Sequence, residues 1–573
     1  MSRKKNKSAM WGRACLTVCL FILSVSTALA GSTKMSKDLE GRTGPEQIDV
    51  IVQYKEVPTQ KHHTVVLGLG GRLKSDLGTF KGGAYRVPAS ALAQLAANPD
   101  VVYISPDREL HGASDTLDYH NETINSAYAW NKGYDGSGIG VAVIDSGIAQ
   151  VPDLPRSDVV YSQDFTGIGS TWDQYGHGTH VSGILAGDGD ESSTWASDYT
   201  FQGVAQGVNL VNLRVLDQNG VGSDSEVIAA LQTAIQLKNA YNIRVINLSL
   251  GRPVFESYLL DPLCQAVEQA WRAGIVVVVA AGNNGRINTN GIDGYGTITA
   301  PGNDPYVITV GAMNTLGSPV RANDVPTSYT SKGPTMLDHV VKPDLVAPGN
   351  LIISLYTPYE TLNQEYPGNE IPTSLYLSYG GSYSSPYYFQ LSGTSMATPM
   401  VSAAAALLLQ EKPAFTPDQV KARLMKSAFK GLQPYSSATD PLTGITYNLQ
   451  ADIFTVGAGL LDVQAALSSS GRVSANVGSA LSPTVVQDPL GNIVLIKGPS
   501  TAWAGGGAWA DSVVWGTSVL WGTDVLGNSV LWGSSVVWGT GTMVGNSVLW
   551  GTSVLWGTSN TPDASVFASG DEY

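Results

Sequence analysis

Three short stretches of the sequence carry a serine, a histidine and an aspartate that could work together in acyl transfer. Ser395 lies in Gly-Thr-Ser-Met-Ala-Thr-Pro, His177 in Gly-His-Gly-Thr-His-Val and Asp145 in Val-Ile-Asp-Ser-Gly. A serine hydroxyl is a weak nucleophile, and it needs a base to accept its proton and a third group to orient that base. The histidine and the aspartate are candidates for those two roles, in the chain order Asp, His, Ser.

The segments around these residues predict the elements that would hold them. The apolar run at 400–409 indicates a buried helix, so Ser395 would lie at a helix N-terminus. Free backbone N–H groups favour negative charge there, which suits a developing oxyanion, although a simple capping serine occupies the same position. The run at 140–147 predicts a buried strand that presents Asp145, and glycines place His177 at the start of an apolar helix.

Residues 120–350 alternate between strand and helix patterns, which predicts an α/β fold with a mostly parallel central sheet. Near-continuous runs of Val and Ile indicate strands that are covered on both faces. We expect strands at 209–216, 244–251, 274–283 and 306–311, and helices at 225–239 and 262–273.

The three motifs together resemble those of the subtilase family of serine endopeptidases, and the similarity continues over roughly residues 120–465. The resemblance implies a subtilisin-like three-layer fold and hydrolysis of proteins or peptides through an acyl-enzyme. It implies Ser395 as nucleophile, His177 as general base and then acid, and Asp145 as the group that orients the imidazole. It also implies Asn283 as the amide donor to the oxyanion, although an asparagine beside a glycine is also an ordinary turn residue.

The resemblance further assigns segments that would bind the substrate. The two extended segments that would pair with the substrate backbone contain Ser249, Leu250, Gly251, Gly220 and Gly222. A peptide would add between them as a strand. The first specificity pocket would be lined by Ala280, Ala281 and Gly282. These small walls leave room for a large apolar side chain, and the neighbouring Asn284 has no charge to favour Lys or Arg. Asp224 departs from the apolar residue expected near the outer pocket.

Other chemistries fit these residues less well. His177 and His180 could be interpreted as a zinc pair, but the helical motif His-Glu-x-x-His has another spacing and a glutamate between its histidines. The Gly-x-Ser-x-Gly pentapeptide of α/β-hydrolases is absent, and the serine comes last in the chain. We therefore assign no metal to this site and expect His180 to support the core.

We recognise no cofactor-binding motif in the sequence. The family resemblance implies that structural Ca²⁺ can be bound, and one loop offers oxygen ligands from Asp188, Asp190 and Glu191. Their spacing matches no known calcium motif, so a solvated acidic loop is the favoured interpretation.

The charge balance and the first residues indicate an exported protein. The chain has 573 residues, with 33 Lys and Arg against 47 Asp and Glu and a net charge of -14. This balance argues against nucleic acid as the main partner. Residues 1–30 combine a basic start, an apolar core and Ala-Leu-Ala, which is typical of a secretory signal peptide, so we expect a secreted, extracellular enzyme. Cleavage would leave Cys264 alone, without a disulfide partner and as a core thiol.

Residues 31–113 predict a small α+β unit ahead of the peptidase motifs. We expect strands at 48–55, 83–88 and 101–107 and a helix at 89–97. The unit resembles the inhibitor prodomain of many subtilases, which implies a self-processing precursor that is cut near residues 111–115. A domain that is retained for stability is the alternative.

The remaining chain divides into a peptidase domain at 114–470, a linker at 471–502 and a tail of Trp-Gly hexapeptide repeats at 503–573. Tryptophans at an even step share one face of a strand, so the tail predicts β structure or a solenoid-like array. Exposed tryptophan is costly, so we expect the tail to attach the enzyme to the cell envelope or a polymer, or to be trimmed after export. A low-complexity tail without a partner is the alternative. If the tail is the main functional element, the chain is instead a surface-binding or structural protein.

Tyrosines crowd residues 356–388, shortly before Ser395, together with several prolines and glycines. This composition predicts an extended loop insertion close to the active site. The loop would be either an aromatic lid over a bound peptide or a surface loop packed on itself.

Overall fold

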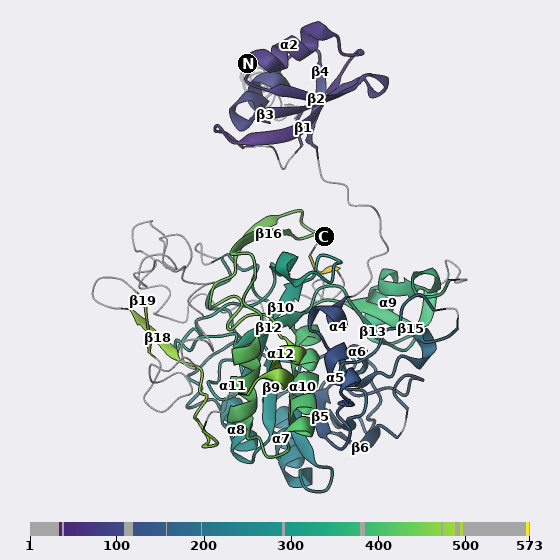
Figure 1. Cartoon of the computed structure of the whole chain (residues 1–573), viewed down its shortest axis with the longest axis vertical. Coiled ribbons are helices and arrows are strands. Elements are labelled where there is room, and N and C mark those ends of the chain that lie inside the picture. Colours follow the sequence, from purple (N-terminus) through teal and green to yellow (C-terminus); the bar gives the residue numbers. More distant parts are fainter. Residues whose placement is uncertain are drawn as a thin grey trace, which may run out of the picture. The chain divides into compact units, whose positions relative to one another are not determined.

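The computed structural model divides the chain into two compact units, Met1–Ser114 and Asp115–Tyr573 (Figure 1). It describes residues 34–36, 39, 41–107, 119–155, 157–195, 197–288, 293–378, 384–470, 474–487, 493–496 and 569–571. The predicted signal peptide, the expected cut near 111–115 and nearly all of the repeat tail lie outside these residues. Within the described ranges, no helix has both the length and the apolar character that a membrane crossing requires.

The first unit is an antiparallel sheet with two helices, which confirms the predicted α+β architecture. Its strands, in the spatial order β2-β3-β1-β4, are β1 (Gln47–Tyr54), β2 (Arg72–Leu77), β3 (Gly82–Pro88) and β4 (Val101–Pro106), and its helices are α2 (Gln60–Gly68) and α3 (Leu92–Ala97). Alternate residues of β1, including Val50 and Val52, are fully buried against Val66, Leu92 and Ile104. The unit therefore has a hydrophobic core of its own.

The second unit is built on a mostly parallel sheet in the order β11-β10-β9-β8-β5-β7-β6, with β12 also paired to β10. The strands are β5 (Gly140–Asp145), β6 (Val159–Asp164), β7 (Asn209–Arg214), β8 (Ile243–Leu248), β9 (Val276–Ala280), β10 (Ile308–Asn314), β11 (Val325–Pro326) and β12 (Leu345–Pro348). Only the β10–β11 pair is antiparallel among the described pairings of this sheet. This arrangement confirms the predicted fold class.

Helices surround this sheet (Figure 1). They are α4 (His120–Thr123), α5 (Ala127–Asn131), α6 (His177–Ala186), α7 (Asp224–Leu237), α8 (Pro262–Arg272), α9 (Thr361–Glu365), α10 (Thr394–Glu411), α11 (Pro417–Ser427) and α12 (Val463–Ser468). Every residue of β5, β9 and β10 is buried, so both faces of the sheet are covered. Helices α6 and α10 pack against each other, and so do α7 and α8.

Local sequence explains where these helices begin. Ser223 caps α7, and Glu226 reaches back to the backbone of Ser223. Asp261 caps α8 ahead of a proline in the first turn. Helix α10 is buried on all sides, as its run of Ala, Leu and Val predicts. Cys264 on α8 is a buried free thiol, which agrees with the expectation of a core cysteine.

The tyrosine-rich segment forms a second, three-stranded sheet, so the expected extended loop is wrong. Strands β13 (Ile352–Leu355), β15 (Ser384–Leu391) and β14 (Glu370–Pro372) pair antiparallel in that order. Tyr376 and Tyr388 are buried, and the Tyr388 hydroxyl donates to Asp153 at 2.5 Å. These tyrosines pack against the body of the second unit, including Phe201, so they are core residues of that unit.

The chain after the peptidase motifs remains attached to the second unit. Two hairpins follow α11, one from β16 (Tyr435–Thr439) and β17 (Thr446–Gln450), the other from β18 (Thr484–Gln487) and β19 (Ile493–Ile496). Between them, Ser482 donates to the buried carboxylate of Asp344 at 2.6 Å and accepts from Lys421 at 2.7 Å. Residues 474–487 therefore pack on the second unit, within the range for which the sequence predicts a linker.

Candidate active site

The residues singled out by sequence lie where parallel strands of the central sheet end. Asp145 is the last residue of β5, Ser249 follows β8, and Ala281 to Asn283 follow β9. In an open α/β sheet the carboxyl ends of the strands share one edge, which is where such folds place their sites. The predicted residues are thus gathered at one edge of the sheet.

Asp145 and His177 form a buried pair. The Nδ1 atom of His177 lies 2.7 Å from Oδ1 of Asp145, and both residues are almost completely excluded from solvent. A carboxylate oxygen can only accept, so Nδ1 carries the proton and Nε2 is left as the basic atom of a neutral imidazole. Burial lowers the pKa of His177, but the charge and the hydrogen bond of Asp145 outweigh it and raise the pKa above the ordinary 6.5.

Asp173 is a buried residue whose role the sequence interpretation missed. It joins the turn after β5 to the start of α6, because it accepts from the Ser146 hydroxyl at 2.9 Å and from the Gly176 and Thr179 amides at 2.8 and 2.7 Å. The Ser146 hydroxyl in turn accepts from the Gly178 amide at 2.9 Å. Burial raises the pKa of Asp173, and these donors oppose the rise. A short Asp-to-Gly spacing just before a helix is the signal that could have indicated it.

Ser395 lies in the first turn of α10. The preceding Gly393 has φ of 151°, a conformation that favours glycine and turns the chain into the helix. The Ser395 hydroxyl donates to the Ser249 carbonyl at 3.1 Å, and the Ser249 hydroxyl donates back to the Ser395 carbonyl at 2.9 Å. In this conformation the Ser395 hydroxyl therefore donates to a backbone carbonyl.

Asn283 is fixed by a residue of the nucleophile motif. Its Oδ1 accepts from the Thr394 amide at 2.9 Å and from the Thr394 hydroxyl at 3.1 Å, and that hydroxyl accepts from the Gly282 amide at 3.2 Å. Within the part of the chain that the structure describes, no hydrogen bond occupies the Nδ2 donor of Asn283. Thr394 therefore fixes the oxygen end of the side chain and leaves the nitrogen end available to a ligand. Thr394 is a second residue that the sequence interpretation did not single out.

The predicted substrate segments differ in exposure. Gly222 and Gly251 are exposed, Gly220 and Leu250 are half-buried, and Ser249 is buried. All three of these glycines are also closely surrounded, and a Cβ at Gly222 would lie 2.2 Å from the Val215 carbonyl oxygen. A Cβ at Gly220 would lie 2.6 Å from the Tyr175 ring, and one at Gly251 would lie 2.6 Å from the Thr299 hydroxyl.

The segment expected to line the first specificity pocket follows β9 without a bulky side chain. Ala280 and Ala281 are buried, and Gly282 has φ of 102°. A Cβ at Gly282 would lie 2.7 Å from the Thr299 methyl group, so only glycine fits at this position.

Asp224, where the family resemblance predicts an apolar residue, forms an ion pair. Arg252 donates to Asp224 at 2.8 Å and to the buried Asp261 at 3.0 Å. The Asp224 charge is therefore balanced by Arg252, which also fastens the start of α7 to the segment after β8.

The other histidine and the acidic loop have structural contacts. His180 is buried, its Nε2 donates to the Phe389 carbonyl at 3.0 Å, and burial lowers its pKa to about 3. It is thus a neutral core residue, as expected. Across the described ranges, no group of three or more His, Cys, Asp or Glu is arranged to hold a metal ion. Asp188 accepts from the Asp190 amide, and calcium binding in this loop stays a prediction.

The fold and these side chains define a class of enzyme. A buried His–Asp pair, a serine at the start of a buried helix and an oriented amide on one edge of a parallel α/β sheet are the parts that a serine endopeptidase requires.

Comparison with known proteins gives the family. The profile described as the subtilase family matches residues 136–459. The serine protease AprX of Bacillus subtilis is 32% identical over 426 residues, which cover 72% of this chain and 87% of AprX. Subtilisin E of the same organism is 31% identical over 453 residues, which cover 78% of this chain and 97% of subtilisin E. The chain therefore belongs to the subtilase family and is a subtilisin-like serine endopeptidase.

A third relative carries its location in its name. The extracellular serine proteinase of Thermus sp. strain Rt41A is 32% identical over 381 residues, which cover 63% of this chain and 74% of the relative.

Proposed function

We propose that Ser395, His177 and Asp145 act as the catalytic triad of this endopeptidase. His177 takes the hydroxyl proton as Ser395 attacks the peptide carbonyl, and then gives that proton to the leaving amine. The ester formed on Ser395 is hydrolysed by water, with His177 again acting as base and then acid. The observation that carries the proposal is the 2.7 Å contact between the buried His177 and Asp145, which supports the required tautomer and stabilises an imidazolium.

We assign the oxyanion donor to Asn283. The negative charge develops on the former carbonyl oxygen while Ser395 attacks, so a donor must be aimed at it in advance. The paired Oδ1 and the available Nδ2 of Asn283 support this role. The start of α10 adds the favourable end of a helix dipole to the same place.

The substrate is a protein or peptide, and we propose that it binds in extended form between two segments. One is residues 249–251 and the other is residues 220–222. Backbone pairing of this kind depends little on the side chains of the substrate, so selectivity would come from the pocket beside Ala280, Ala281 and Gly282. Residues 280–284 carry no carboxylate, and we expect the pocket beside them to take large apolar side chains.

The N-terminal unit is proposed as an inhibitory propeptide of a secreted precursor. Its independent core supports folding as a separate body, and the family resemblance supports occupation of the active site until cleavage between residues 111 and 115. The basic and apolar residues at 1–30 support export. Attachment of the repeat tail to an envelope or a polymer stays a prediction.

Expression of the full chain with Ser395→Ala tests the function and the processing together. We expect an uncut, inactive precursor, because the cut requires the nucleophile that performs catalysis. Ser427→Ala is the control, since its hydroxyl contacts only the Leu424 carbonyl of its own helix in the described structure, and it should be processed normally. A pure Ser395→Ala protein that cuts itself or hydrolyses a peptide would contradict the proposal.

A further inference from the structure

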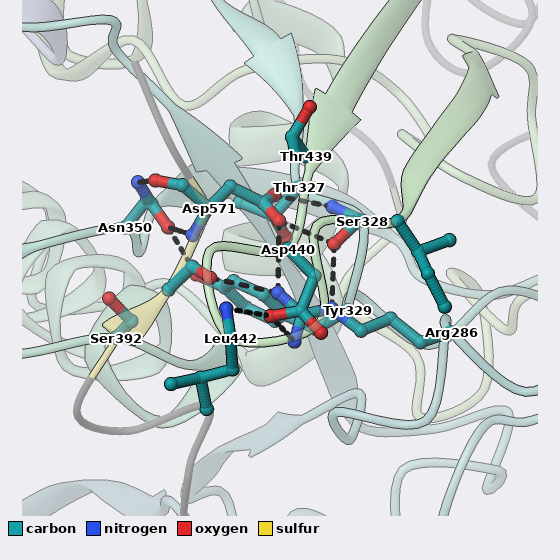
Figure 2. Close-up of polar contacts among 12 residues, drawn as sticks. Arg286, Thr327, Ser328, Tyr329, Asn350, Ser392, Thr439, Asp440, Leu442 and Asp571 are labelled. Atoms are coloured by element: carbon teal, nitrogen blue, oxygen red, sulfur yellow. Dashed lines mark hydrogen bonds and ion pairs between the residues drawn. The ribbon is translucent and has the colours of Figure 1, made fainter. Parts of the chain in front are cut away.

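A buried aspartate far from the active-site residues in sequence lies in a polar site on the peptidase unit. Asp571, near the end of the repeat tail, is fully excluded from solvent and surrounded by Arg286, Ser328 and Asn350 (Figure 2). These three residues come from separate segments of the unit, after β9, after β11 and before β13. A buried carboxylate is tolerated only where donors replace its water.

Every polar atom of Asp571 has a partner in this site. Its carboxylate accepts from the Ser328 amide at 2.6 Å, from the Ser328 hydroxyl and from Arg286 at 3.1 Å. Its own amide donates to Asn350 Oδ1 at 2.7 Å, and Asn350 Nδ2 donates to its carbonyl at 3.0 Å. Arg286 also donates to the Gly570 carbonyl at 2.8 Å. Side chain and backbone of the segment are thus both recognised.

The arginine of this site is held by contacts that do not involve the bound segment. Arg286 pairs with Asp440 at 2.9 Å, donates to the Ser328 hydroxyl at 2.8 Å and lies over the Tyr329 ring (Figure 2). A guanidinium fixed in this way is oriented for a carboxylate before one arrives. Burial raises the pKa of Asp571, and the Ser328 and Arg286 donors oppose that rise.

The site is selective for the pair Gly-Asp. Gly570 has φ of 57°, and a Cβ there would lie 2.4 Å from both Asn350 Oδ1 and the Ser392 hydroxyl. A larger residue at 570 would therefore clash with the site. An asparagine at 571 would turn an N–H₂ group toward either the Ser328 amide or the Arg286 guanidinium, both of which are donors.

The segment before the repeat is also fastened to the peptidase unit. The Val341 amide donates to the Pro483 carbonyl at 2.8 Å, and the Val485 amide donates to the His339 carbonyl at 2.9 Å. Described residues on both sides of the repeat, at 483–485 and at 570–571, therefore contact the peptidase unit.

We propose that Arg286, Ser328 and Asn350 form a binding site for a Gly-Asp peptide, which this chain fills with its own Gly570 and Asp571. Occupation of the site attaches Gly570 and Asp571, near the end of the chain, to the peptidase unit. The inference is independent of the roles proposed for the active-site residues.

Thermal melting of the full-length enzyme, blocked with a serine-directed phosphonate to prevent autolysis, tests the site. Asp571→Asn and Gly570→Ala should each lower the melting temperature by about 2–4 °C, because the first places a donor against the donors of the site and the second places a methyl group against Asn350 and Ser392. Glu256→Gln, which neutralises an exposed carboxylate elsewhere on the unit, should leave it unchanged. An unchanged melting temperature for Asp571→Asn would overturn the proposal.

A peptide added in trans separates a binding site from a merely structural contact. A chain that ends at Ala568 should melt at a lower temperature than the full-length chain. The peptide Ser-Gly-Asp-Glu-Tyr should bind saturably to this shortened chain and raise its melting temperature to that of the full-length chain. The same peptide with Asp571→Asn or Gly570→Ala should bind at least tenfold more weakly, and Arg286→Ala in the shortened chain should weaken the unmodified peptide similarly. Equal restoration by the three peptides, or none by any of them, would overturn the assignment of a Gly-Asp site.

Discussion

Substitutions at Asn283 and Thr394 test how the oxyanion donor is held. The Asn283 amide oxygen accepts from Thr394 twice, through the backbone amide at 2.9 Å and the hydroxyl at 3.1 Å. In the related enzyme subtilisin, removal of the oxyanion asparagine amide lowers kcat by about 10²–10³-fold. We expect the same loss for Asn283→Ala, with KM nearly unchanged, because the bond forms mainly in the transition state.

The effect of Thr394→Val can be worked out from the same contacts. The substitution keeps the shape and the 2.9 Å backbone bond but removes the hydroxyl bond to Asn283. One neutral hydrogen bond is worth about 1 kcal/mol, which corresponds to roughly a fivefold loss in kcat if it acts only through the orientation of the amide. The Gly282 amide also loses its acceptor, so a lower melting temperature should accompany the kinetic effect.

The assay is a double-mutant cycle on a soluble peptide substrate. Once Asn283 is alanine, Thr394→Val has no amide left to orient and should cause no further loss in kcat. Thr446→Val, on the exposed hairpin strand β17, is the matched control and should leave kcat unchanged. Losses that multiply in the double variant would refute the positioning role of Thr394, and a wild-type kcat for Asn283→Ala would refute the oxyanion role.

Three further predictions follow from the site and the fold. The Asp145 charge raises the His177 pKa above 6.5 despite burial, and His177 must be neutral to act as a base. We therefore expect kcat/KM to rise with pH and to reach half its maximum above pH 6.5. A lower midpoint, or a rate that falls through neutral pH, would contradict this expectation. Since Asn284 and its small neighbours carry no negative charge, a peptide library should show cleavage after large apolar residues, and dominant cleavage after Arg would contradict it. A chain ending at Ile496 should keep its kcat on a soluble peptide. A chain ending at Gly471 also loses the buried contacts of residues 472–496 and should melt several degrees lower than the chain ending at Ile496. Equal melting temperatures of the two chains would contradict the packing of that segment.

The elements that carry the active site were predictable because their signals are local. The Val and Ile run of β9 indicates a doubly covered strand, and the apolar run after Ser395 indicates a buried helix. Asp145 and Asn283 follow from their positions at the ends of such strands. The edge of the sheet at which they meet then follows from the parallel topology alone.

The contacts that orient the site were not predictable in the same way. Thr394 holds Asn283 across 111 residues, and Asp173 bridges a strand turn and a helix start through side-chain hydrogen bonds. Such bonds leave no periodicity in the sequence, so only the fold reveals them. Thr394 and Asp173 lie within or beside the sequence motifs, but the sequence did not indicate which residues they contact.

Non-local strand pairing explains the errors outside the site. Strand β13 pairs with β15 some thirty residues later, and three of the tyrosines that suggested a loop, Tyr356, Tyr376 and Tyr388, are buried in the core. Strand β2 in the first unit is mostly exposed and lacks alternation, so no pattern indicated it. The Gly570–Asp571 contact depends on three distant segments and has no counterpart in local sequence.

Covalent labelling of the processed enzyme by a serine-directed phosphonate, with the adduct mapped by mass spectrometry, tests whether the nucleophile is the one assigned here. We expect one adduct per molecule at Ser395, formed in proportion to the loss of peptidase activity and much more slowly in His177→Ala. Full inactivation with the adduct on another residue, or peptidase activity that survives complete modification of Ser395, would contradict the proposed triad.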